Sequence, residues 1–84
     1  MWKVKIEVIL KKSVLDPQGA AVEKSLAALG YGNVEKMRVG KYLEFTLTGV
    51  DREEGEAKVR EMCQRLLVNP VIEDYTFELV EGAR

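Results

Sequence analysis

Few residues in this chain are equipped for chemistry, and the most conspicuous feature is what is absent. The 84 residues include no histidine and a single cysteine, Cys63. Without histidine, the chain can form neither a Cys–His pair nor a Ser–His–Asp triad, and it lacks the commonest general base near neutral pH. Cys63 falls on the apolar stripe of a predicted helix, which is typical of a packed core thiol. The sequence therefore gives no basis for catalysis by this chain alone.

The stretch from Val14 to Gly19, with the sequence Val-Leu-Asp-Pro-Gln-Gly, is a strand-to-helix corner. Asp16 can accept hydrogen bonds from the free N–H groups that begin a helix, and Pro17 suits the first helical position. Gly19 lets another backbone segment approach closely. Asp16 is thus first a helix cap and second a candidate for binding a partner.

Basic residues precede this corner and recur later, as Lys11, Lys12, Arg38 and Lys41. They form either a basic patch that meets phosphate or an acidic partner, or ordinary surface charge. The carboxylates of the second predicted helix are best explained as solvated helix charge rather than a metal or acid–base site; they are Glu53, Glu54, Glu56 and Glu61.

A third polar stretch is Asn69-Pro70 followed by Glu73. Pro70 cannot continue a helix and biases Asn69 away from helical angles. Glu73 occupies an apolar face of the last predicted strand, and an unpaired buried charge there would cost several kcal/mol. We therefore expect Glu73 to be paired, to lie at the end of the sheet, or to face a subunit interface.

The elements that must position these residues follow from hydrophobic periodicity. Alternation from Trp2 to Leu10 predicts a strand with one buried face. A helix should begin at Pro17 and end near Leu29, with Gly30 as its left-handed cap. Asp51 should cap a second helix that ends before Pro70. A last strand should run through Val71, Tyr75, Phe77 and Leu79, followed by a tail over residues 81–84.

The middle segment, Val34 to Thr48, keeps its apolar residues in phase across Gly40-Lys41. This phase argues against a two-residue hairpin turn and allows either a three-residue loop or one long strand bent at Gly40. We favour the long strand, whose overhanging half would offer a pairing surface to a second subunit. The fold class is thus α+β, with an antiparallel sheet in β-α-β-α-β order, or in ferredoxin-like βαββαβ order, and two helices on one face.

Length and composition narrow the possible functions. Eighty-four residues make one domain over residues 1–84 with a thin core, so oligomerisation is expected. A net charge of −1 removes the electrostatic basis for nonspecific nucleic-acid binding. No apolar run is long enough for a membrane span or a signal peptide, and we expect a cytoplasmic protein. One cysteine allows no disulfide within the chain.

Three stretches at compatible spacing, Val14–Gly19, Arg38-Val39-Gly40-Lys41 and Leu66–Glu73, resemble the PurS family. That family is the small subunit of phosphoribosylformylglycinamidine (FGAM) synthase of purine biosynthesis. The resemblance implies a non-catalytic homodimer, or a dimer of dimers. It would hold the synthetase subunit (PurL) and the glutaminase subunit (PurQ) together and help form the ammonia passage between them. It also implies ATP and Mg in the synthetase subunit, and no cofactor, metal or catalytic site in this chain.

The family-like positions that could contact a partner are Lys11, Asp16, Gln18, Gly19, Arg38, Lys41, Asn69 and Glu73. The main alternative is a small-ligand-binding regulatory module on a ferredoxin-like scaffold. An acylphosphatase-type enzyme would need an arginine-bearing, glycine-rich loop, which the corner at Leu10–Ser13 lacks. An RNA-recognition module would need aromatic residues on one basic face, whereas here they are split between two phases.

Overall fold

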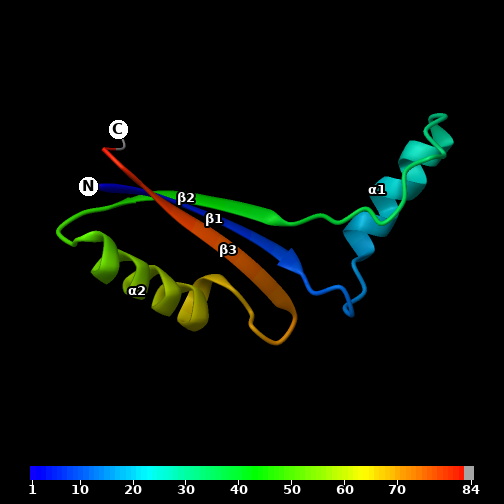
Figure 1. The fold of residues 1–84 in the computed structure, drawn as a ribbon. Helices are drawn as coiled ribbons and strands as arrows, with labels where there is room; N and C mark the ends of the chain where they lie inside the picture. The colour runs from blue at the N-terminus through cyan, green and yellow to red at the C-terminus, as the bar shows by residue number, and fades with distance from the viewer. Residues whose placement is uncertain (83–84) are drawn as a thin grey trace.

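The computed structural model describes residues 1–82, and the last two residues of the predicted tail lie outside the described residues. Three strands and two main helices follow one another in β-α-β-α-β order (Figure 1). Their bounds are β1 Trp2–Leu10, α1 Pro17–Ala28, β2 Lys41–Leu47, α2 Arg52–Met62, the π-helical turn η1 Cys63–Leu67, and β3 Glu73–Glu81. The predicted α+β class and its first alternative order are confirmed.

The strands form one antiparallel sheet in the order β2-β1-β3. In its register Ile6 of β1 lies between Leu43 of β2 and Phe77 of β3, so the apolar phases of all three strands share one face. We call this the inner face; the opposite, outer face carries the charged phase of β1. The predicted alternation of β1 is therefore the feature that organises the sheet.

Helix α2 packs across the inner face, against β1 and β3. Its Val59 is fully buried, as is Cys63 where the helix runs into η1. Gly55 faces the sheet, where an added Cβ would lie 2.8 Å from Cδ2 of Leu79. The end of the helix widens, because the amide of Val68 donates to the carbonyl of Cys63 at 3.0 Å, and the helix stops before Pro70 as predicted.

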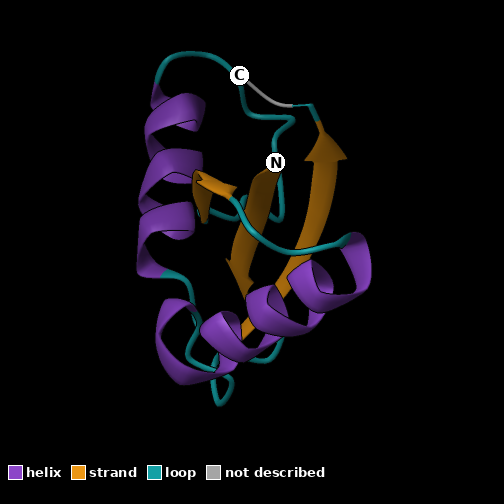
Figure 2. Cartoon of the chain, turned by 90° about the vertical axis from the view of Figure 1, so that its left-hand side faces the viewer, coloured by secondary structure: helices purple, strands orange, loops and turns teal. Residues whose placement is uncertain are grey.

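Helix α1 begins at Pro17 as predicted, but it does not lie on the sheet with α2. It projects past the end of the sheet, away from α2 (Figure 1), and the two helices run in different directions (Figure 2). The expectation of two helices on one face therefore holds only for α2. The physical reason is that the corner after β1 leads the chain away from the sheet, while the stripe on α1 that includes Val22 and Leu29 stays exposed.

The predicted long middle strand is wrong in length. Strand β2 covers only Lys41–Leu47, and residues 31–40 return alongside α1 without strand pairing (Figure 1). The ladder ends where Val8 pairs with Lys41. Because β1 itself ends at Leu10, the residues before Val39 would have no strand residue opposite them in this register. The phase argument itself is confirmed, because Leu43, Phe45 and Leu47 all pack toward the core.

The chain thus consists of two regions. The body comprises residues 1–12 and 41–82, and the arm comprises residues 13–40, with α1 and its returning segment. The radius of gyration is 16.3 Å, with extents of 50 × 29 × 14 Å, whereas a compact domain of this length would have a radius of roughly 12 Å. The arm accounts for this elongation.

Candidate functional site

Asp16 lies at the base of the arm and joins its two segments. Its Oδ1 accepts from the amide of Gly19 at 2.8 Å, which caps α1, and its Oδ2 accepts from the amide of Val39 at 2.9 Å. The side chain is only 6% exposed. These backbone donors, with Arg38 nearby, lower the pKa of Asp16 below its ordinary value. The predicted helix cap is confirmed, and the same carboxylate also holds the returning segment.

Gly19 permits the closest approach between the two segments. A Cβ built at this position would lie 2.3 Å from the carbonyl oxygen of Met37 and 2.9 Å from Oδ2 of Asp16. Since one obstacle is backbone, no side-chain rotation could relieve the clash. The amide of Met37 also donates to Oε1 of Glu23 on α1 at 3.0 Å. The predicted close approach at Gly19 is therefore observed, and it occurs within the chain.

Arg38 turns its guanidinium onto the corner that follows β1. Its Nη1 donates to the carbonyl of Val14 at 3.0 Å, and its Nη2 donates to the carbonyls of Lys12 at 2.9 Å and Lys11 at 3.3 Å. The planar guanidinium thus joins both segments at the base of the arm. We call Asp16, Gly19 and Arg38 the clamp.

The remaining members of the anticipated basic patch are partly neutralised. Lys11 forms an ion pair with Asp74, with Nζ and Oδ1 3.7 Å apart, and Lys41 pairs with Glu73 at 3.8 Å. Arg38 is engaged with carbonyl groups as well, so three of the four basic residues have partners within the chain, whereas Lys12 is exposed.

Asn69 and Glu73 close the loop before β3. Oε1 of Glu73 accepts from the amide of Asn69 at 2.7 Å, and the carbonyl of Asn69 accepts from the amide of Glu73 at 2.8 Å. The Asn69 side chain accepts from the amide of Val71 at 3.1 Å. The Glu73 side chain is 18% exposed. Glu73 is therefore paired within the chain and lies at the end of the sheet, two of the three environments expected for it.

Together these bonds explain why β3 begins at Glu73 rather than at Val71, as the apolar pattern suggested. The loop is also tied to the base of the arm, because the amide of Lys11 donates to the carbonyl of Ile72 at 2.8 Å. Of the eight predicted partner positions, seven thus take part in close contacts within the chain, whereas the side chain of Gln18 is exposed on α1. Contact of these eight residues with a partner remains a prediction.

Sequence analysis missed an apolar groove on the body, on the same face as α2. It has a volume of about 670 Å³ and runs between β2 and the α2–η1 segment, lined by residues that include Phe45, Leu47, Met62, Leu66 and Leu67. Leu66 is 83% exposed. The sequence signal for this groove was the adjacent pair Leu66-Leu67 in η1. Neighbouring residues on a helix point in different directions, so one apolar stripe cannot bury both side chains.

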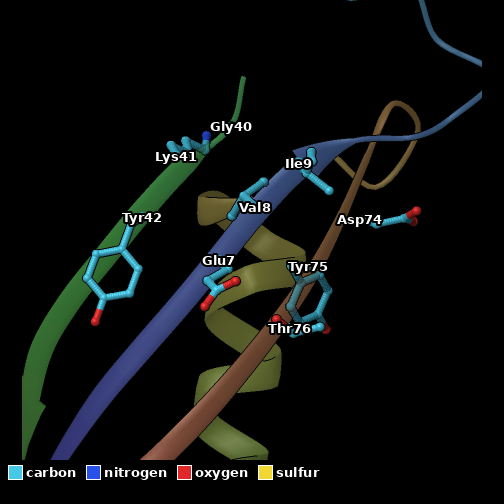
Figure 3. Close-up of a pocket in the computed structure, with 9 residues that line it drawn as sticks. All are labelled: Glu7, Val8, Ile9, Gly40, Lys41, Tyr42, Asp74, Tyr75 and Thr76. Atoms are coloured by element: carbon cyan, nitrogen blue, oxygen red, sulfur yellow. The ribbon is translucent and has the colours of Figure 1, made fainter. Parts of the chain in front are cut away.

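A smaller hollow of about 520 Å³ lies near the base of the arm (Figure 3). Glu7, Tyr42 and Thr76 line it from three adjacent strands. The Tyr42 hydroxyl donates to Oε2 of Glu44 at 2.8 Å, which raises the pKa of Tyr42 and helps lower that of Glu44. Lys3, 2.8 Å from Glu44, is the larger cause of the lowered Glu44 pKa.

The single cysteine lies in the core of the body. Cys63 is buried, and burial raises the pKa of its thiol, so the predicted core thiol is confirmed. Within residues 1–82, no group of three or more histidine, cysteine or acidic side chains is arranged to hold a metal ion. None of the helices formed by these residues has both the length and the apolar character needed to cross a bilayer.

Comparisons with known proteins agree with this architecture. The family model for PurS, described as phosphoribosylformylglycinamidine (FGAM) synthase, matches residues 3–81. The Bacillus subtilis phosphoribosylformylglycinamidine synthase subunit PurS is 51% identical, over 96% of this chain and 95% of that protein. A crystal structure of B. subtilis PurS aligns with a TM-score of 0.87, over 96% of this chain and all of that one.

A second solved structure, PurLQS from Thermotoga maritima, contains a chain that aligns with a TM-score of 0.85 at 32% identity, over 94% of this chain and 96% of that one. The comparisons do not favour the regulatory-module alternative. With a family match over nearly its whole length and relatives of the same fold and size, this chain belongs to the PurS family.

Proposed function

We propose that this chain is the small, non-catalytic subunit of FGAM synthase, which holds the synthetase subunit PurL and the glutaminase subunit PurQ together. The observation that carries the proposal is a projecting arm together with an open apolar groove on the body, in a chain without histidine. Such a molecule is built to join proteins rather than to transform a substrate. The Thermotoga maritima structure, named PurLQS, contains a chain of the same fold.

A homodimer is the first part of this proposal. The exposed stripe of α1 includes Val22 and Leu29, and the groove beside α2 lies where a second helix could cover the inner face. Helix α1 has 12 residues, about 18 Å in length, and its own body lies out of its reach. We place the α1 of a second copy in this groove, so that each copy supplies the helix that the other lacks.

The ammonia passage is the second part. Ammonia released in bulk water near neutral pH becomes mostly protonated and is then no longer a nucleophile, so a water-excluding joint between two active sites keeps it reactive. ATP and Mg would belong to the synthetase subunit, and the complex would work in the cytoplasm. This chain contributes apolar surface and shape to the joint rather than reacting groups.

Reconstitution tests the proposal directly. The chain is mixed with the synthetase and glutaminase subunits, ATP and the formylglycinamide ribonucleotide substrate, and product is measured with glutamine or with ammonium as the nitrogen source. We expect glutamine-dependent product to require this chain and ammonium-dependent product to be independent of it. Equal dependence with both nitrogen sources, or none with either, would contradict the adaptor role.

A further inference from the structure

The path of the arm is fixed differently from that of every other element. Helix α2 is anchored by buried apolar side chains, whereas the clearest ties of the arm are polar: the Asp16 carboxylate, the Arg38 guanidinium and the Glu23 carboxylate each bind backbone groups. Apart from the bond between Asp16 and Gly19, they connect the outgoing segment of the arm with its return across 14 to 24 positions of sequence. Arg38 also binds the carbonyls of Lys11 and Lys12 in the body. They specify one path for a segment that projects from the sheet.

The local backbone supports the same conclusion. Lys36 has a φ of 60°, in the left-handed region that non-glycine residues seldom occupy. Such a conformation persists only where the surrounding structure fixes it. It is followed directly by Met37, Arg38 and Val39, whose amide or guanidinium groups make the bonds at the base of the arm. The returning segment is therefore held in one conformation rather than simply lying against α1.

An arm fixed before association loses less conformational entropy on binding. Ordering a loose segment lowers affinity, and rigidity in the bound conformation removes that cost. Because the clamp lies at the base of the arm, a small rotation there would displace the far end of α1 by several times as much as the clamp itself moves. The clamp is therefore suited to setting where α1 is presented.

We infer that Asp16 and Arg38 are positioning residues that act within one chain, orienting the arm for a second copy rather than contacting a partner themselves. The inference rests on the proposed homodimer and deepens it, because it assigns the control of dimer geometry to two named side chains. It also changes the expected role of these family-like residues: their side chains are largely occupied by the backbone of their own arm.

The test uses Asp16→Asn and Arg38→Met in the full chain, with Lys12→Met as the matched control. Asn keeps one acceptor but presents an amide group to one of the two N–H donors, and Met removes the guanidinium. Lys12→Met removes a positive charge at the same corner, where only the Lys12 backbone contacts Arg38. Arg38→Lys keeps the charge without the planar guanidinium, and serves if Arg38→Met fails to fold.

Three quantities are measured: amide hydrogen exchange at Gly19 and Val39, the dimer dissociation constant by sedimentation, and the fluorescence of Trp2. Trp2 is buried at the start of β1, whereas the arm follows the other end of that strand, so it reports whether the body is folded. We expect both clamp variants to exchange faster at these amides and to raise the dissociation constant about tenfold or more. Trp2 fluorescence and the Lys12→Met variant should match the unaltered chain.

Two results would overturn the inference while leaving the homodimer intact. One is a weakened dimer with unchanged exchange at Gly19 and Val39, which would mean that Asp16 and Arg38 touch the partner directly. The other is faster exchange with an unchanged dissociation constant, which would mean that the arm needs no pre-orientation. An unaltered chain that stays monomeric at all concentrations would instead overturn the homodimer, and the inference with it.

Discussion

The body and the arm of this chain are stabilised by different forces. The body buries Val4, Ile6, Val59 and Cys63 completely between the sheet and α2, so its fold is secured by the hydrophobic effect. In the arm, only Asp16 and Gly19 are buried, and polar bonds to backbone groups define its path. The difference teaches that one region forms its core within a single copy, while the other is shaped in advance for something outside it.

The largest effect should come from the body core. Ile6→Ala removes a fully buried side chain from the central strand, and such a truncation costs about 2–5 kcal/mol. Since a domain has only about 5–15 kcal/mol of stability, we expect a large fall in the urea midpoint followed by Trp2 fluorescence at fixed protein concentration. Ile9→Ala, on the outer face at 43% exposure, is the control. Similar losses for both variants would contradict the comparison.

Gly19→Ala should disturb the arm without unfolding the body. Its Cβ would meet the backbone oxygen of Met37 at 2.3 Å, so the returning segment must move while the body stays folded. We expect the dimer dissociation constant to rise about tenfold or more as the arm loses its orientation, with Trp2 fluorescence unchanged. Gly32→Ala is the matched control, because no heavy atom lies within 4 Å of its Cβ position. A stable dimer in Gly19→Ala would show that arm and partner adapt to each other.

The body was largely predictable from sequence, because its signals are local. Alternation predicts the buried face of β1, and residue type and position predict Asp51 as the cap of α2. The same local signal also predicts the Asp16 cap in the arm, and both side chains accept from the amide three residues on. The odd-numbered phase of β2 was also recovered, because a sheet with one buried face fixes the parity of each strand.

The arm was less predictable, because its placement depends on contacts distant in sequence. No sequence pattern predicts that Arg38 donates to carbonyl groups 24 to 27 positions earlier. Periodicity predicts that the apolar stripe of α1 is buried, but it does not show whether the chain's own sheet or a second copy covers that stripe. Partner-interface candidates chosen from family likeness therefore fell mostly on residues that shape the chain itself.

Leu66→Glu tests whether the apolar groove of the body binds a second copy. Because it is 83% exposed in one copy, Leu66→Glu should change the free energy of unfolding of the body by no more than about 0.5 kcal/mol. It should nevertheless weaken the dimer several-fold by placing a charge in the apolar groove. Sedimentation and urea unfolding measure the two effects. Val71→Glu, equally exposed at 79% but outside the groove lining, is the control, and an equal effect on the dimer would place the interface elsewhere.

Acid should loosen the arm locally, which is the smallest expected effect. The folded pKa of Asp16 is lowered, so its ionised carboxylate stabilises the folded arm above the unfolded pKa of about 3.9. That stabilisation is lost as the pH falls through the lower folded pKa. Amide protection at Gly19 and Val39 should therefore hold at pH 5 and decline below about pH 4. Asp16→Asn should remove this dependence, because it has no carboxylate to protonate. The contrary result is that the buried amides of β1 and the amides of the arm lose protection at the same pH, in the unaltered chain and in Asp16→Asn alike. The arm and the body would then unfold as one cooperative unit, and they would differ in geometry but not in stability.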